Sequence, residues 1–307
     1  MSFHKRPNLF IIGAPKCGTT SLHAYLGQHP QVFMSEAKEP SHFAYAGKNP
    51  YGWDSQCRYA ALDAYLSLFE ASGSADIVGE SSTCYSLMPQ VPKAICAHNP
   101  EAKIVAVLRN PVERAWSMYL YWHQFESTSQ PVHFVDFRKR FIADDLPTHH
   151  AKSQTRRVEW LRGASMYWSN LSYYFDVFPH EQIKLVSYDE YAKQPQACLN
   201  DLCQFLGVTE FKFDTSVKLN TTVNPRFRSL YNFTNLQVNH PLRRAIKKGL
   251  GNLVPLRMLR QAVNRSIHVK LQLPNYLYNE LIGYFHQDLE RLRHYTGFTV
   301  DSWLRPR

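Results

Sequence analysis

The chain has 307 residues, of which 44% are hydrophobic, and a formal net charge of +10. No run of about 18 apolar residues occurs, and the polar start at residues 1–8 lacks the apolar stretch of a secretory signal. These features argue against a transmembrane protein and a secreted one, and we expect a soluble, cytoplasmic protein whose length suits one large α/β domain or two small ones.

Hydrophobic patterning predicts strands and helices that alternate along the chain. The residues at 9–12 favour a buried strand, and those at 19–29 favour a helix with apolar positions at helical spacing. A short strand at 32–34, a helix at 62–69 and strands at 77–79 and 104–108 follow, and Pro111 opens the next helix. We expect a strand at 183–186 and helices at 198–206 and 276–292. This alternation predicts a P-loop-like α/β fold, with a mostly parallel sheet flanked by helices on both faces.

The excess positive charge lies in one segment. Residues 215–279 contain eleven Lys and Arg and no Asp or Glu, whereas the remaining chain has 24 Lys and Arg against 25 Asp and Glu. Such a segment suits an anionic ligand, an anionic polymer or a membrane surface. We expect a basic helical lobe or lid at 236–275 within a single domain over 1–307. Its amphipathic part, 236–260, is compatible with membrane-surface contact, although Gly249, Gly251 and Pro255 interrupt it.

The cysteines and histidines do not predict a metal site or a disulfide framework. The six cysteines include no CxxC pair, and the fourteen histidines are not at ligand spacing from them. We therefore expect no bound metal.

A glycine-containing loop, Gly13-Ala-Pro-Lys-Cys-Gly-Thr-Thr-Ser21, joins the first predicted strand to the first helix. Backbone N–H groups and the positive end of a helix make such a turn an anion site. A nucleotide triphosphatase would have lysine where this chain has Thr19, and here Lys16 lies inside the loop. That placement argues against ATP or GTP hydrolysis. A cation inside the loop suits sulfonate transfer, in which negative charge grows on the bridging oxygen of a leaving phosphate; the alternative is that Lys16 is an ordinary exposed lysine.

A second candidate anion site follows the strand at 104–108. Arg109 comes at the carboxyl end of that strand, where ligands of open α/β sheets bind, and arginine can hold a phosphate in a bidentate manner. Ser117 lies about two helical turns further on. We interpret Arg114 as a surface or packing residue.

These two segments resemble the nucleotide-binding motifs of the sulfotransferases that use 3′-phosphoadenosine-5′-phosphosulfate (PAPS). The resemblance implies that Lys16 contacts the bridging oxygen and that Arg109 and Ser117 bind the 3′-phosphate. It also implies that the loop binds the 5′-phosphosulfate through Pro15, Lys16, Cys17, Gly18, Thr19, Thr20 and Ser21. The segment 224–228 resembles a basic loop that closes over the nucleotide, so that Arg226 or Arg228 meets the 3′-phosphate; alternatively, both are ordinary members of the basic segment.

The acceptor side is suggested by the sequence Lys38-Glu-Pro-Ser-His-Phe43. It resembles a segment of the carbohydrate sulfotransferases, including the heparan sulfate enzymes, and the resemblance implies that Glu39 is the general base. A base is needed because an acceptor hydroxyl is a poor nucleophile. His42 is the rival base, since an imidazole titrates closer to neutral pH. The alternative interpretation of Glu39 is an exposed loop carboxylate with no catalytic role.

A further segment, residues 78–85, resembles a second family motif, in which a strand leads into Glu-Lys-Ser/Thr-Pro-x-Tyr. Glu80 is expected to orient the acceptor, assist the base or cap a turn, and Tyr85 to line the acceptor cleft. Ser81 and Thr83 stand where the family motif has lysine and proline. The missing lysine suggests a less anionic acceptor than a heparan chain.

The sequence thus predicts a sulfotransferase that moves the sulfonate of PAPS to an acceptor hydroxyl, with a carbohydrate as the favoured acceptor. A small natural product or a lipid hydroxyl is the main rival acceptor. The alternatives outside this class are a P-loop nucleotide kinase or hydrolase and a module that binds nucleic acid or membrane through the basic segment, although we expect no nucleic-acid partner.

Overall fold

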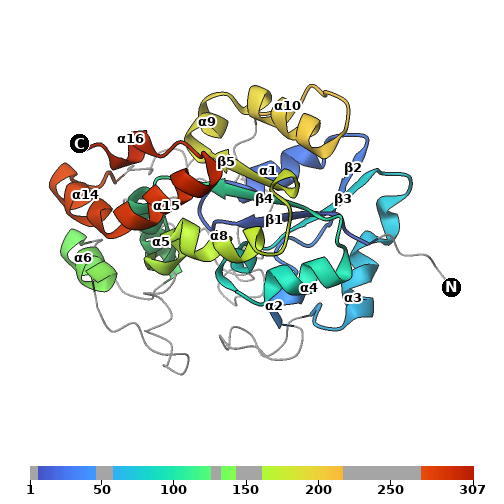
Figure 1. Cartoon of the computed structure of the whole chain (residues 1–307), viewed down its shortest axis with the longest axis horizontal. Coiled ribbons are helices and arrows are strands. Elements are labelled where there is room, and N and C mark those ends of the chain that lie inside the picture. The colour runs from blue at the N-terminus through green and yellow to red at the C-terminus, as the bar shows by residue number, and fades with distance from the viewer. Residues whose placement is uncertain (1–5, 46–57, 126–132, 143–160, 217–270) are drawn as a thin grey trace, which may run out of the picture.

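A parallel β-sheet forms the centre of the computed structural model, which describes residues 6–45, 58–125, 133–142, 161–216 and 271–307 (Figure 1). Its five strands lie in the order β2-β3-β1-β4-β5, and every pairing is parallel. The strands are β1 (Leu9–Gly13), β2 (Val32–Met34), β3 (Ile77–Ser81), β4 (Lys103–Leu108) and β5 (Ile183–Ser187). All residues of β1 and β3 are buried, as expected for strands covered on both faces.

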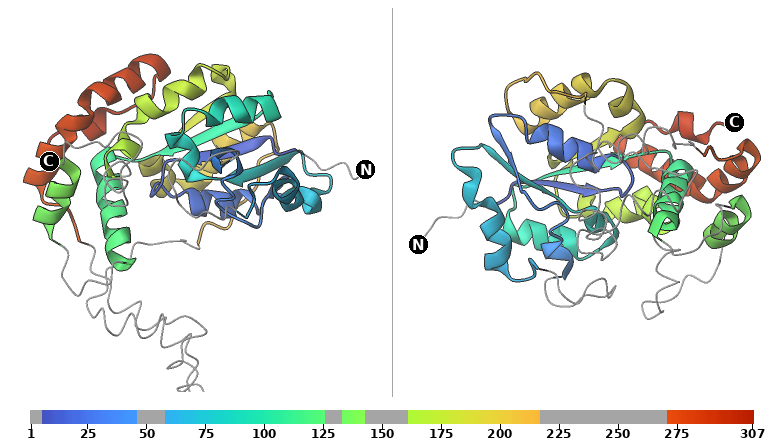
Figure 2. Two further views of the ribbon diagram at one scale, coloured as in Figure 1. Left: turned by 90° about the horizontal axis from the view of Figure 1, so that it is seen from below. Right: turned by 180° about the vertical axis from the view of Figure 1, so that it is seen from behind.

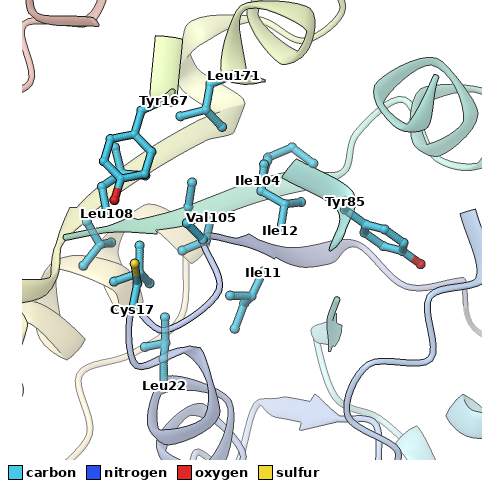
Figure 3. Close-up of a cluster of buried hydrophobic side chains, with 14 of the residues drawn as sticks. Ile11, Ile12, Cys17, Leu22, Tyr85, Ile104, Val105, Leu108, Tyr167 and Leu171 are labelled. Atoms are coloured by element: carbon cyan, nitrogen blue, oxygen red, sulfur yellow. The ribbon is translucent and has the colours of Figure 1, made fainter. Parts of the chain in front are cut away.

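Helices cover both faces of this sheet (Figures 1 and 2). In Figure 3, Tyr167 and Leu171 of α8 pack on one side of β1 and β4, and Leu22 of α1 packs on the other. The α-helices are α1 (Thr19–Leu26), α2 (His42–Tyr45), α3 (Leu62–Leu66), α4 (Val91–His98), α5 (Pro111–Phe125), α6 (Phe134–Ile142), α8 (Tyr167–Phe175), α9 (Tyr188–Lys193), α10 (Pro195–Leu206), α14 (Asn275–Ile282), α15 (His286–Thr296) and α16 (Asp301–Leu304). Short 3₁₀ turns are η1 (Ser67–Ser72), η2 (Thr83–Leu87), η3 (Gly163–Ser165), η4 (His180–Gln182) and η5 (Gly283–Phe285).

The predicted fold class is confirmed, and three helix predictions need correction. The helix expected at 19–29 ends at Leu26. The helix expected at 62–69 ends at Leu66 and continues as the 3₁₀ turn η1. The helix expected at 276–292 is divided into α14 and α15 by η5, which begins at Gly283. Glycine has a low helix propensity, and this favours a change from α-helix to the tighter 3₁₀ geometry at Gly283.

The strand order determines which loops can meet. Because β1 lies between β3 and β4, the loops that follow these three strands emerge side by side at the carboxyl edge of the sheet. Those loops carry Lys16, Thr83 and Arg109. Chemistry-bearing residues from three distant parts of the sequence are therefore brought to one edge.

Arg114 packs in the interior rather than on the surface. It is fully buried on α5, where its Nε donates to the Ser165 hydroxyl and its Nη2 donates to the Leu161 carbonyl. The packing interpretation is thus confirmed, and the surface interpretation is wrong. The residues that bury Arg114 lie about fifty residues further along the chain, so the local sequence does not reveal the burial.

Most of the predicted basic lobe, 236–275, lies outside the described residues, apart from 271–275. Within the described ranges, no helix is both long and apolar enough to cross a membrane. Their cysteines are free thiols, namely Cys17, Cys84, Cys96, Cys198 and Cys203.

Candidate functional site

The loop after β1 makes a tight turn into α1. Gly18 precedes the helix with a φ of 83°, in the left-handed region, and Lys16 has a φ of 70°. A Cβ at Gly18 would lie 3.1 Å from the Tyr188 ring, and a Cβ at Gly13 would lie 2.7 Å from the Ser86 hydroxyl. Both glycines are therefore needed, by backbone conformation and by close packing.

Cys17 is an interior residue of this loop. Its side chain is fully buried, and Figure 3 places it next to Leu22, beneath β4. Burial raises the pKa of the Cys17 thiol to about 11, so the thiol stays neutral at physiological pH. We therefore assign Cys17 a packing role within the predicted donor loop, and leave the anion contacts to the backbone and to its neighbours.

Lys16 is half-buried and lies close to Arg109. Its Nζ is 4.2 Å from the centroid of the Tyr121 ring, a cation–π distance. Burial and the positive charge of Arg109 lower the pKa of Lys16 to about 8. The two cations of the predicted donor site are thus close enough to repel each other, and an anion bound between them would relieve that repulsion.

Arg109 directly follows β4 and is held from several sides. Its guanidinium donates to Oε2 of Glu113 at 3.3 and 3.4 Å and lies 4.8 Å from the centroid of the Tyr188 ring. The Arg109 carbonyl accepts a hydrogen bond from the Tyr167 hydroxyl at 2.6 Å. The side chain is 21% exposed, so it remains accessible to a ligand.

Glu113 links Arg109 to the C-terminal segment. Its other oxygen, Oε1, accepts a 2.5 Å hydrogen bond from Nη2 of Arg307, whose guanidinium lies 4.1 Å from the Tyr278 ring centroid. Burial alone would raise the pKa of Glu113, but the hydrogen bond from Arg307 and the charge of Arg109 outweigh it and lower that pKa. Glu113 therefore stays ionised and orients Arg109.

Four residues at intervals of four line up on this part of the chain: Arg109, just before α5, and Glu113, Ser117 and Tyr121 on the helix. Residues at this spacing share one helix face. Ser117 is 8% exposed. The sequence motifs indicate Arg109 and Ser117 but not Glu113 and Tyr121, and the repeated spacing of four is the signal that points to the latter two.

The predicted base, Glu39, lies across the sheet edge on the β3 side. Its carboxylate accepts hydrogen bonds from the Thr83 backbone N–H at 2.7 Å and from the Thr83 hydroxyl at 3.1 and 3.2 Å. Lys38 pairs with it at 2.6 Å, and the Glu39 side chain is 39% exposed. The carboxylate is thus fixed in direction and still open to solvent, as a general base requires.

His42 is not placed as a base. Its side chain is 6% exposed, stacks on the Tyr65 ring at 4.4 Å, and donates from Nδ1 to the Tyr59 carbonyl at 2.8 Å. Burial lowers its pKa. The structure therefore favours Glu39 over His42, because the imidazole is enclosed in an aromatic cluster.

Glu80 and Tyr85 also lie in the interior. Both side chains are 0% exposed, and the Tyr85 hydroxyl donates to Glu80 Oε1 at 2.8 Å. The predictions that Glu80 orients the acceptor and that Tyr85 lines the acceptor cleft are therefore corrected, since neither side chain reaches an accessible surface. Ser81, at the position of the family's lysine, is also buried and bonds to His23 Nδ1 at 2.9 Å.

The remaining predicted site residues fall into two groups. Pro15 and Thr19 are buried, and Thr20 and Ser21 are partly exposed at the start of α1, where the helix dipole favours an anion. Arg226 and Arg228 lie outside the described residues, as does the segment 236–260. In the described part of the chain, no group of three or more His, Cys, Asp or Glu side chains could hold a metal ion.

The residues present fit an elongated ligand with two anionic groups. The turn at Gly18 exposes a helix start beside Lys16, and Arg109 offers a second cationic group from the neighbouring strand. PAPS carries a phosphosulfate at one end and a 3′-phosphate at the other, so its charges match this pair of half-sites.

Comparisons with known proteins agree with this arrangement. The sulfotransferase domain profile matches residues 6–253. The bifunctional heparan sulfate N-deacetylase/N-sulfotransferase 1 of Caenorhabditis elegans is 29% identical over 212 residues, covering 69% of this chain and 23% of the relative. The human heparan sulfate glucosamine 3-O-sulfotransferase 6 is 26% identical over 217 residues, covering 70% of this chain and 56% of the relative. The chain thus spans about a quarter of the first relative's length and about half of the second's.

A solved structure extends the likeness to the whole fold. The sulfotransferase from Alicyclobacillus acidocaldarius is 25% identical, with a TM-score of 0.70, covering 98% of this chain and all of that one. The match over residues 6–253 decides against the nucleotide kinase or hydrolase that the sequence left open. The chain therefore belongs to the sulfotransferase family, whose enzymes depend on PAPS.

Proposed function

We propose that this protein transfers the sulfonate group of PAPS to a hydroxyl of an acceptor, and that the acceptor is a carbohydrate. The observation that supports the proposal most strongly is the meeting of three loops at one sheet edge. Lys16 follows β1, Arg109 follows β4, and Glu39 is bonded to Thr83, which follows β3. The proposed donor site and the proposed base thereby lie at the same edge of the sheet.

The residues divide the reaction between them. The acceptor hydroxyl attacks the sulfur in line, and its proton passes to the Glu39 carboxylate as the new oxygen–sulfur bond forms. The bond between sulfur and the bridging oxygen breaks, which leaves 3′-phosphoadenosine 5′-phosphate (PAP) with added negative charge at that oxygen. Lys16 stabilises this charge, and it does so most strongly in the transition state.

Binding of the donor falls to the remaining cations and the loop. Arg109 and Ser117 hold the 3′-phosphate, and the backbone from Gly18 to Ser21 holds the phosphosulfate. Positioning and charge stabilisation do most of the catalysis in the analogous phosphoryl transfers, so no covalent enzyme intermediate is required. Arg226 and Arg228 remain predicted contacts of the 3′-phosphate.

The test is transfer of radiolabelled sulfonate by the wild type and by the Lys16→Ala and Glu39→Ala variants. We expect kcat to fall by roughly 10²–10³ in each variant, as when one transition-state contact or a general base is removed. Lys193→Ala and Glu36→Ala are matched surface controls, because both side chains are exposed. Full activity in Lys16→Ala and Glu39→Ala would refute the assignment.

The acceptor proposal rests on relatives that act on heparan sulfate. A panel of N-acetyl heparosan, N-desulfated heparin with free amines, and sterol or small-molecule alcohols separates the choices. Labelling of N-acetyl heparosan supports a carbohydrate hydroxyl. Labelling of only the amine polymer points to N-sulfation, and labelling of only the alcohols points to a lipid or natural-product acceptor. The cytoplasmic location and the single-domain organisation stay predictions.

A further inference from the structure

A buried acid that the proposed reaction does not use lies at the end of β3. Glu80 is 0% exposed, and its carboxylate accepts three hydrogen bonds. Its Oε1 accepts from the hydroxyls of Tyr85 at 2.8 Å and Tyr65 at 3.1 Å, and its Oε2 accepts from the Ser82 hydroxyl at 2.6 Å. Hydrogen bonds from three different hydroxyls offset part of the cost of burying this group.

Two of these hydroxyls also bind the base segment, residues 39–43, which contains the predicted base Glu39. The Ser82 hydroxyl accepts the backbone N–H of Ser41 at 2.9 Å, and the Tyr85 hydroxyl accepts the backbone N–H of Phe43 at 3.2 Å. Each hydroxyl therefore donates to Glu80 and accepts from the base segment. A hydroxyl that donates to a carboxylate is a stronger acceptor, so the two contacts reinforce each other.

The backbone of the base segment needs such support. Glu39 and Ser41 have φ values of 61° and 56°, in the left-handed region that non-glycine residues rarely adopt. Residues in this conformation persist only where the surroundings hold them. The Glu39 N–H also donates to the Ser81 carbonyl, at 2.8 Å. The N–H groups of 39, 41 and 43 thus all bind residues 81–85, at the end of β3 and just after it.

We propose that Glu80 is a positioning residue that holds the Glu39 segment through the Ser82 and Tyr85 hydroxyls. This inference rests on the proposed function, because it assigns Glu80 to the support of the base in that reaction. This positioning role replaces the direct contact with the acceptor that the sequence suggested, because a fully buried side chain cannot reach the acceptor. Thr83, from the same short segment, orients the Glu39 carboxylate itself, so residues 80–85 fix both the backbone and the side chain of the base.

The two phenols provide a matched pair of variants. Tyr65→Phe and Tyr85→Phe each remove one hydrogen bond to the same oxygen of Glu80, from rings that are both 0% exposed. Only the Tyr85 hydroxyl also accepts from the base segment. A purely structural role for this cluster would make the two variants alike.

The experiment compares turnover, donor affinity and amide exchange. We expect Tyr85→Phe to lower kcat on the order of tenfold, to leave the Kd for PAP within about twofold, and to speed hydrogen exchange of the Phe43 amide on the order of tenfold. Tyr65→Phe should leave all three within about twofold of wild type. Ser82→Ala should reproduce the loss of kcat, with faster exchange at Ser41 instead.

Equal kcat in the two phenol variants, or unchanged exchange at Phe43 in Tyr85→Phe, would overturn the inference. Unchanged PAP binding verifies that each variant is folded. Wild-type transfer onto the acceptor panel is measured first. If the wild type labels nothing, the proposed function fails and the catalytic part of the inference fails with it, whereas the exchange comparison still decides whether Tyr85 holds the turn.

Discussion

Replacing Glu80 by glutamine should change how the stability of the protein depends on pH. Burial raises the pKa of Glu80 from 4.5 to about 7, although the hydrogen bonds from Ser82, Tyr85 and Tyr65 act in the opposite direction. Glutamine has nearly the same shape and cannot ionise. Its amide can donate to the Ser82 hydroxyl, and its carbonyl can accept from the two phenols.

The sign and size of the effect follow from proton linkage. Between pH 4.5 and 7 the folded protein keeps a proton on Glu80 that the unfolded chain loses, so the free energy of unfolding falls as pH rises. The contribution of the protonated acid is complete below pH 4.5 and lost above pH 7. For these two pKa values the loss between pH 5 and pH 8 is about 2–3 kcal/mol.

Urea unfolding of the wild type and Glu80→Gln at pH 5 and pH 8 measures this difference. All other titrating groups are shared, so their contributions largely cancel in the comparison. We expect the wild type to lose about 2–3 kcal/mol relative to the variant over this interval. Parallel pH dependences for the two proteins would refute the placement of Glu80 as a fully buried acid.

Three further predictions concern the donor site. Since burial and a neighbouring arginine lower the pKa of Lys16 to about 8, the Kd for PAP should rise about tenfold between pH 7 and pH 9, as calorimetry can measure. Arg307→Ala should weaken PAP binding roughly two- to fivefold, because Glu113 loses its 2.5 Å partner and competes with the phosphate for Arg109. Gly18→Ala should lower the free energy of unfolding by about 1–3 kcal/mol and weaken PAP binding, because its φ is 83° and a Cβ would lie 3.1 Å from the Tyr188 ring.

Each of these predictions has a matched control. Lys16→Ala should remove most of the pH dependence of PAP binding, and an unchanged dependence would assign it to another group. Arg305→Ala removes an exposed arginine two residues from Arg307 and should leave PAP affinity unaltered. Gly73 has a φ of 52°, and a Cβ added there would have no atom within 4 Å. Gly73→Ala should therefore lower the free energy of unfolding only through backbone strain, and it should leave PAP binding intact.

The sheet was largely predictable because its strands are nearly continuous apolar runs. Residues 9–12 and 104–108 satisfy this pattern, and both lie in buried strands of the central pair β1 and β4. The short helices were less predictable. The helix α8, for example, is rich in aromatic and polar residues, and its position depends on packing against the sheet and α15.

The placement of the candidate site residues was predictable where these residues follow strands. Lys16 lies in the loop after β1 and Arg109 directly follows β4, and a parallel sheet places such residues at one edge. The burial of Glu80 and His42 was not predictable, because it is decided by residues distant in the sequence. Tyr65, which stacks on His42 and bonds Glu80, lies more than twenty residues from the first and fifteen from the second.

The acceptor side is built separately from the donor side, and this separation bears on specificity. The base segment is bonded to residues after β3, whereas the donor loop and Arg109 follow β1 and β4. Ser81 occupies the position where resembling enzymes have lysine, and its hydroxyl bonds to His23 Nδ1. Since His23 Nε2 donates to the Ser35 carbonyl and burial lowers the pKa of the ring, His23 is neutral near pH 7 and does not replace the missing charge. The position of the family's lysine is therefore buried and uncharged here, on the β3 side and apart from the cations proposed to bind the donor. The absence of that charge is in keeping with the expectation of a less anionic acceptor than a heparan chain.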